Sequence, residues 1–236
     1  MGVTFLSINS KGLNHPVQRK SLWSEALQFK SDILCAQETH FCATAQLKCS
    51  HKSYPYVSTA NAESKKRGVL TAIRDTVSFQ LHKEIKDPSG RYLILICDIN
   101  STTYTIANVY TPNSHLMKFL NKQLKKIDLL RRGALVICRD FILAPDKTID
   151  STSTSTRKGP SLLSTLHQHR SYSRIDLFLV DQSLLSRTTN TTINTITWSD
   201  HASVTLTIKD SLSSGANPSL LQREDTRKLL ETQLNA

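Results

Sequence analysis

The sequence predicts an α/β protein in which two β-sheets pack face to face and helices cover their outer faces. Three observations lead to this prediction. Short apolar runs bounded by polar clusters recur along the chain, as strands do. Two of them are separated only by Asn100-Ser101-Thr102, which is typical of an antiparallel hairpin. Other runs alternate with helical patterns, which is typical of strand–helix–strand units.

The N-terminal half alternates between strand and helix patterns. Residues 3–8 alternate in polarity and predict a strand, after which Gly12 to Pro16 break the pattern. Apolar residues at helical spacing then predict a helix over 17–29, with Pro16 near its N-terminus. Further strands are expected at residues 32–37, 68–73, 92–99 and 103–110.

In the C-terminal half, residues 114–130 have helical periodicity and residues 134–138 form a buried strand pattern. A Ser/Thr-rich loop is expected at 146–159. The remaining expected elements are a helix at 160–166, a strand at 174–180, a short helix at 182–186, a Thr/Ile-rich segment at 189–198 and an alternating segment at 202–208. The composition changes at residue 210, so we predict a domain over 1–209, followed by a linker and an amphipathic helix over 210–236.

Charge and composition narrow the classes of function. The chain has 236 residues and a formal net charge of +11, which favours a polyanionic partner such as nucleic acid. No run of about 18 apolar residues is present, so we expect no membrane partner. Five cysteines without a CxxC pair disfavour a zinc ribbon or a complete disulfide framework. The N-terminus lacks a secretory pattern, and we expect an intracellular, more specifically nuclear, protein that is monomeric.

Carboxylates follow several of the predicted strands. Glu38, Asp140, Asp176 and Asp200 each lie where an apolar run ends, and strand ends lie at the rim of a sandwich. A cluster of carboxylates repels itself unless it holds a cation, and hard oxygen ligands suit Mg²⁺ or Mn²⁺. His201 directly follows Asp200, and Asp176 could orient it for acid–base work on a phosphate ester.

Six short motifs resemble those of the endonuclease/exonuclease/phosphatase superfamily. They are SINSKGLN at 7–14, QETH at 37–40, NVYTPN at 108–113, RDF at 139–141, SRID at 173–176 and SDH at 199–201. Within the superfamily they are most similar to the apurinic-like endonuclease domain of LINE-1-type retrotransposons, over residues 3–209. The resemblance implies a DNase I-like, four-layered α/β-sandwich that nicks DNA with Mg²⁺, or with Mn²⁺.

The resemblance also implies roles for single residues. Glu38 matches the family's metal ligand, Asn9 the asparagine that supports the metal and phosphate site, and Asp200 a further acid near the metal. The other matched residues act on the phosphate or the attacking water. Tyr110 and Asn113 match contacts to the scissile phosphate, Asp140 the acid that positions water, and Asp176 the partner of the catalytic histidine, His201.

Two departures from the family pattern leave a second function open. Ile142 replaces the amide of the usual Gly-Asp-Phe-Asn, and the segment before Ser171 is shorter than in related domains. These features suggest a degenerate or truncated copy, so the alternative to an active endonuclease is an inactive DNA-binding remnant. A phosphatase acting on a small phosphate ester is a third option, which the charge of +11 argues against.

Overall fold

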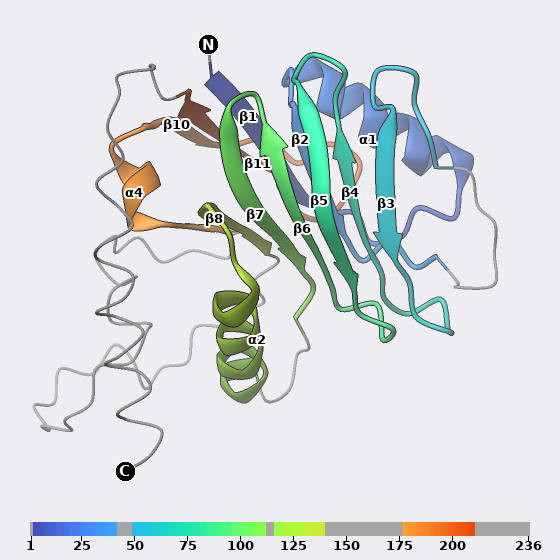
Figure 1. Ribbon diagram of the computed structural model, residues 1–236. Coiled ribbons are helices and arrows are strands. Elements are labelled where there is room, and N and C mark those ends of the chain that lie inside the picture. Colours follow the sequence, from blue (N-terminus) through green and yellow to red (C-terminus); the bar gives the residue numbers. More distant parts are fainter. Residues whose placement is uncertain (1, 42–48, 112–115, 140–176, 211–236) are drawn as a thin grey trace, which may run out of the picture.

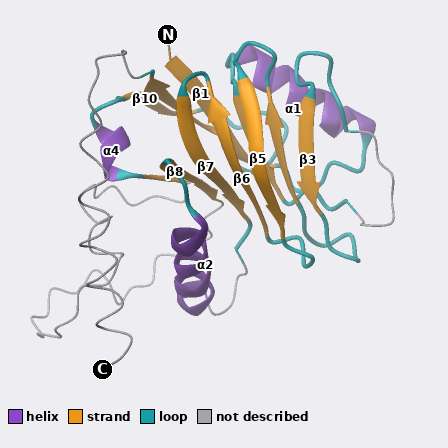
Figure 2. Cartoon of the chain, viewed as in Figure 1, coloured by secondary structure: helices purple, strands orange, loops and turns teal. Residues whose placement is uncertain are grey.

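The computed structural model describes residues 2–41, 49–111, 116–139 and 177–210. Within these ranges, two mixed β-sheets pack face to face, and one long helix lies on the outer face of each sheet (Figure 1). Among the described residues, strands account for more of the chain than helices, which number two long ones and one short one (Figure 2). The predicted α/β-sandwich is therefore confirmed.

The first sheet has six strands in the order β10-β11-β1-β2-β4-β3. Their bounds are β10 Thr188–Ile193, β11 Val204–Lys209, β1 Gly2–Asn9, β2 Ile33–Gln37, β4 Val69–Ile73 and β3 Tyr56–Ala60. Since β1 and β2 are parallel, their last residues, Asn9 and Gln37, are paired at one end of the sandwich. β11 is antiparallel to β1, with Val204 opposite Ser7, so the chain enters β11 from that same end.

The second sheet has five described strands in the order β5-β6-β7-β8-β9. Their bounds are β5 Phe79–Lys86, β6 Tyr92–Ile99, β7 Thr102–Val109, β8 Ala134–Arg139 and β9 Leu177–Val180. The predicted hairpin is confirmed as β6–β7. Strand β5 was not predicted from the sequence. It lies at the sheet edge and its middle residues are exposed, so it lacks an apolar run.

Three apolar clusters hold the layers together. Side chains such as Phe5, Ile33, Leu95 and Ile106 fill the space between the two sheets. On one outer face, helix α1 (Pro16–Gln28) packs its apolar side against strands β1, β2 and β4. On the other, helix α2 (Leu116–Leu130) packs against strands β6, β7 and β8. A short helix, α4 (Gln182–Leu185), follows β9, as the sequence predicts.

Several sequence predictions fall on residues outside the described ranges. They are the loop at 146–159, the helix at 160–166, the start of the strand at 174–180, and the linker and helix at 210–236 beyond Asp210. The boundary between a domain over 1–209 and a C-terminal segment therefore stays a prediction. Among the described helices, none combines the length and apolarity that crossing a membrane requires.

A buried polar network links the two sheets near the end of the sandwich where β1 and β2 terminate. Gln37 Nε2 donates to Asn108 Oδ1 at 2.8 Å, which joins the end of β2 to the end of β7. Asn108 Nδ2 in turn lies 2.8 Å from the Leu70 carbonyl oxygen and 3.2 Å from that of Ala36. Because Asn108 is fully buried, these bonds fix which ends of the two sheets meet.

Replacing Asn108 with alanine is expected to lower the free energy of unfolding by roughly 1–3 kcal/mol, since Gln37 Nε2 and the Leu70 carbonyl lose a buried partner. Urea unfolding followed by circular dichroism measures the change. The exposed Asn190→Ala on β10 serves as the matched control. A loss for Asn108→Ala no larger than for Asn190→Ala would contradict this role.

Candidate functional site

The loops that follow β1 and β2 are bonded to each other beyond the ends of the strands. The Gly12 N–H donates to the Glu38 carbonyl at 2.7 Å, and the Leu13 N–H donates to the Thr39 carbonyl at 2.9 Å. Gly12 has φ of +108°, and a Cβ there would lie 3.2 Å from His40 Nδ1. Only glycine suits this close approach, so the Lys-Gly-Leu segment can lie directly against the Glu38 loop.

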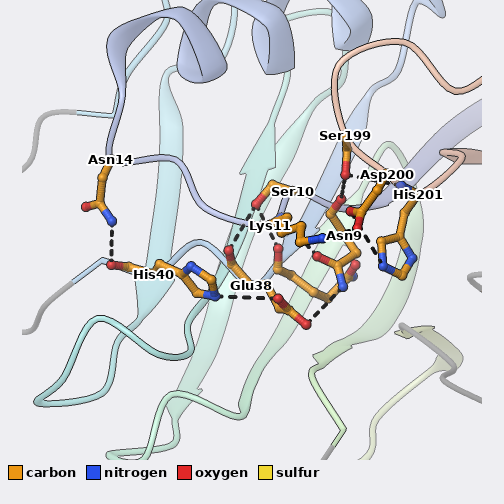
Figure 3. Close-up of polar contacts among 10 residues, drawn as sticks. Asn9, Ser10, Lys11, Asn14, Glu38, His40, Ser199, Asp200 and His201 are labelled. Atoms are coloured by element: carbon orange, nitrogen blue, oxygen red, sulfur yellow. Dashed lines mark hydrogen bonds and ion pairs between the residues drawn. The ribbon is translucent and has the colours of Figure 1, made fainter.

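Glu38 is held from two sides. Asn9 Nδ2 donates to its Oε1 at 3.1 Å, and His40 Nε2 lies 3.5 Å from its Oε2 (Figure 3). Asn9 is itself buried, and its Oδ1 accepts the Lys11 backbone N–H at 3.0 Å. The amide of Asn9 is thus fixed with its NH₂ toward Glu38. These contacts make Asn9 a support for the Glu38 carboxylate, and its predicted role in supporting a metal and phosphate site stays a prediction.

Asp200 lies at the same end of the sandwich and forms an ion pair with the Lys11 ammonium. The hydrogen bond from Lys11 lowers the pKa of Asp200, and the same contact raises the pKa of Lys11. Glu38 also contributes to the raised pKa of Lys11, so both carboxylates act on one ammonium. The predicted convergence of residues 38 and 200 at one end of the stack therefore matches the geometry (Figure 3).

His201 lies beside Asp200 in the segment before β11. Its Nε2 is 3.9 Å from Asp200 Oδ1, and its side chain is 31% exposed to solvent. Ser199 anchors this segment to β1, because its Oγ donates to the Asn9 carbonyl at 2.6 Å and accepts the His201 N–H at 3.3 Å. Asn9 thus contacts both parts of the site, Glu38 through its side-chain amide and the His201 segment through its backbone carbonyl.

Glu25 of α1 provides a second anchor that sequence reasoning missed. This buried carboxylate accepts hydrogen bonds from Trp198 Nε1 and Ser203 Oγ, which flank the Ser199–His201 segment. Hydrogen bonds to a charged group are worth about 1.5–3 kcal/mol each, so Glu25 ties the histidine segment firmly to the outer helix.

We expect Glu25→Ala to destabilise the protein by roughly 2–3 kcal/mol, since two buried donors lose their shared acceptor. Chemical unfolding monitored by tryptophan fluorescence measures this loss, because Trp198 reports on the affected contact directly. Exposed Glu63→Ala provides the comparison. Equal stabilities of the two variants would show that the Glu25 contacts do not hold the segment.

The remaining predicted site residues divide into one described residue and three undescribed ones. Tyr110 follows β7, is half-buried, and donates its backbone N–H to the Arg91 carbonyl at 2.7 Å. Since Asn108 bonds Gln37, the end of β7 and therefore Tyr110 lie at the same end of the sandwich as Glu38. Asn113, Asp140 and Asp176 lie outside the described residues. Of their sequence neighbours, Arg139 and Leu177 are paired between β8 and β9.

The chemistry of the described donors suits Mg²⁺ in type. Glu38 and Asp200 supply carboxylate oxygens, which are the ligands this ion prefers. Within the described ranges, however, no group of three or more His, Cys, Asp or Glu side chains is placed to hold a metal. Of any metal site at this end, the described residues therefore include two carboxylates, Glu38 and Asp200. The ammonium of Lys11 interacts with both of them.

Solved structures share this architecture. The AP endonuclease LMAP from Leishmania major superposes with a TM-score of 0.64 at 16% identity, covering 89% of this chain and 88% of its own. The endonuclease domain of TRAS1, a telomere-specific non-LTR retrotransposon, superposes with a TM-score of 0.60 at 15% identity, covering 89% and 100%. The catalytic domain of human Nocturnin gives 0.55 at 16% identity, covering 88% and 93%. No family model matches the sequence.

The chain has the DNase I-like α/β-sandwich fold of these structures. The neighbours are members of the endonuclease/exonuclease/phosphatase superfamily, and they include a retrotransposon endonuclease. Within this fold, the motif residues Asn9, Glu38, Asp200 and His201 lie together at one end. Lys11 of the SINSKGLN motif, to which the sequence assigned no role, lies there as well and pairs with Asp200.

Proposed function

We propose that this protein is a Mg²⁺-dependent DNA endonuclease of the LINE retrotransposon type, which hydrolyses phosphodiester bonds. The observation that carries the proposal is the convergence of Glu38, Asp200 and His201 at one end of an endonuclease/exonuclease/phosphatase fold. Several solved neighbours with this fold are AP endonucleases, and one is a retrotransposon endonuclease.

The reaction assigns a distinct task to each side of the site. Glu38 and Asp200 would hold the metal, which supplies charge neutralisation at the phosphate and at the leaving oxygen. His201 is exposed enough to hydrogen-bond a phosphoryl oxygen or to pass a proton to it. Water adds to phosphorus as the bond to the 3′-oxygen breaks, leaving a 3′-hydroxyl and a 5′-phosphate. Asn9 orients Glu38, and Ser199 orients the backbone of His201.

Basic residues at the same end of the sandwich favour DNA over a small phosphate ester. Lys65, Lys66 and Arg67 lie between β3 and β4, and β4 begins at Val69 opposite Gln37. Arg91 lies beside Tyr110, and burial together with the charge of Arg67 lowers its pKa. Guanidinium groups that repel each other in this way are stabilised by a bound anion, and a DNA backbone supplies several phosphates in a row.

Removing two of these charges should weaken DNA binding in a salt-dependent way. We expect the double variant Lys65→Ala/Lys66→Ala to reduce the slope of log affinity against log salt by roughly 0.9 for each phosphate that is no longer neutralised. Fluorescence anisotropy with a labelled duplex between low and moderate salt measures the slope. The control is the double variant Lys83→Ala/Lys209→Ala, which removes the same charge. Lys83 is exposed in the middle of β5, and Lys209 lies at the end of the strands opposite to Glu38. An equal slope change in both double variants would remove the Glu38 end from the DNA interface.

The proposed activity is tested by conversion of supercoiled plasmid to the nicked circle. The purified protein should nick with Mg²⁺ and should stop nicking when EDTA is added. Ligation of the product by DNA ligase would report the expected 3′-hydroxyl and 5′-phosphate. Absence of nicking at any Mg²⁺ or Mn²⁺ concentration would reject the enzyme.

The second candidate is a DNA-binding protein without catalytic activity. Ile142, which motivates it, lies outside the described residues. The observation that favours it is the ion pair between Lys11 and Asp200, which occupies one of the two described carboxylates. It predicts salt-dependent DNA binding without nicking. The Ile142→Asn variant distinguishes a damaged site from a collapsed one, because restoring the amide should produce nicking only in the first case.

A further inference from the structure

Lys11 is anchored at its backbone, while its side chain is largely exposed and pairs with Asp200. Its N–H donates to Asn9 Oδ1, its φ is +46°, and the following Gly12 lies against the Glu38 loop. The base of the side chain is therefore fixed relative to Glu38. The side chain itself is 62% exposed, so the ammonium can leave its position without disturbing the core.

The Lys11 ammonium interacts electrostatically with both Asp200 and Glu38. It forms an ion pair with Asp200 (Figure 3). The charge of Glu38 contributes, to a smaller extent, to the raised pKa of Lys11. These are the two carboxylates that would hold a divalent ion. A cation entering between them must displace the ammonium from Asp200 or share the space with a like charge, and both alternatives oppose binding.

We propose that the Lys11 ammonium competes with the divalent metal for Asp200. This competition raises the metal concentration that is needed to fill the site. This inference depends on the proposed metal-dependent function. An exposed ion pair is weak, so the ammonium competes with the metal without excluding it. Mg²⁺ or Mn²⁺ carries twice the charge of the ammonium and displaces it at sufficient concentration. The side chain of Lys11 then becomes available to a phosphate at the same end.

Direct measurement of Mn²⁺ binding tests this competition without relying on activity. The paramagnetic resonance signal of free Mn²⁺ gives the dissociation constant for each protein form. Lys11→Met keeps the linear side chain and removes its charge, so we expect it to bind Mn²⁺ roughly two- to fivefold more tightly than the wild type. Lys11→Arg keeps the charge and should bind as weakly as the wild type. Lys209→Met removes one charge at the opposite end and should leave the constant unchanged.

The outcomes separate this inference from the function on which it rests. If wild type and Lys11→Met bind Mn²⁺ equally, the competition is wrong while the metal site survives. If Lys209→Met tightens binding as much as Lys11→Met, net charge and not position is responsible, and the inference is again wrong. If no form binds Mn²⁺ at millimolar concentration, the metal-dependent function fails with it. Thermal unfolding of each variant checks that it is folded.

Discussion

His201→Ala is expected to reduce plasmid nicking by roughly 10²–10⁴-fold, because a positioned acid–base group contributes about that factor to proton transfer. The substitution should leave the fold intact. His201 is only partly buried, and the segment that carries it is held by Ser199 and by the Glu25 contact to Trp198. Initial rates of conversion from supercoiled to nicked plasmid, with unfolding curves measured in parallel, give the result.

The matched control for this variant is His82→Ala. His82 on β5 also pairs with a carboxylate, since its Nε2 lies 2.9 Å from Asp98 Oδ2. It belongs to the exposed edge of the second sheet and has no place in the proposed chemistry. A comparable loss of nicking in both histidine variants would mean that the effect comes from structure. Unchanged nicking in His201→Ala would remove the histidine from the mechanism.

The second large effect concerns Glu38. Glu38→Gln keeps the shape of the side chain and an oxygen that accepts the hydrogen bond from Asn9, but it removes the negative charge. We expect the nicking rate at low millimolar Mg²⁺ to fall by about 10²–10³-fold, which is the usual effect of removing one preorganised electrostatic interaction from an active site. Raising the Mg²⁺ concentration should recover part of the rate, because the defect lies in metal affinity.

Exposed Asp75→Asn removes the same charge just beyond the C-terminal end of β4, away from Glu38, and should retain wild-type nicking. A Mg²⁺ titration of both variants separates affinity from turnover. A Glu38→Gln protein with the wild-type Mg²⁺ dependence would contradict a metal role for this carboxylate.

The elements that sequence patterns predicted are those with an apolar helix face or a continuous apolar strand run. Helix α1 and strand β2 agree with the prediction to within one residue. The buried residues of α1 recur at helical spacing, and β2 is a short run buried at every position. Strand β5 shows the limit of this reasoning. It contributes to the sheet through backbone pairing with β6, while His82 and Lys83 are exposed. An edge strand of this kind gives only a weak hydrophobic signal, since Phe79, Leu81 and Ile85 are separated by polar residues.

The site could be predicted only as far as residues follow strands. Glu38 and His201 carry family motifs and lie at strand ends, so their meeting is a consequence of topology. The contacts that complete the site join residues far apart in sequence. Lys11 and Asp200 are separated by 189 positions, and Glu25 and Trp198 by 173. A local sequence pattern cannot predict such pairs, because they depend on how the loops after β1 and before β11 lie relative to each other.

The claim at the centre of this account is that Glu38 and Asp200 hold one divalent ion beside His201. Crystals soaked in millimolar Mn²⁺ and measured at the manganese absorption edge test it most directly. The account predicts one anomalous peak within coordinating distance of both carboxylates, with the Lys11 ammonium moved away from Asp200. Anomalous peaks only elsewhere on the molecule, with the Lys11–Asp200 pair intact at saturating Mn²⁺, would contradict it.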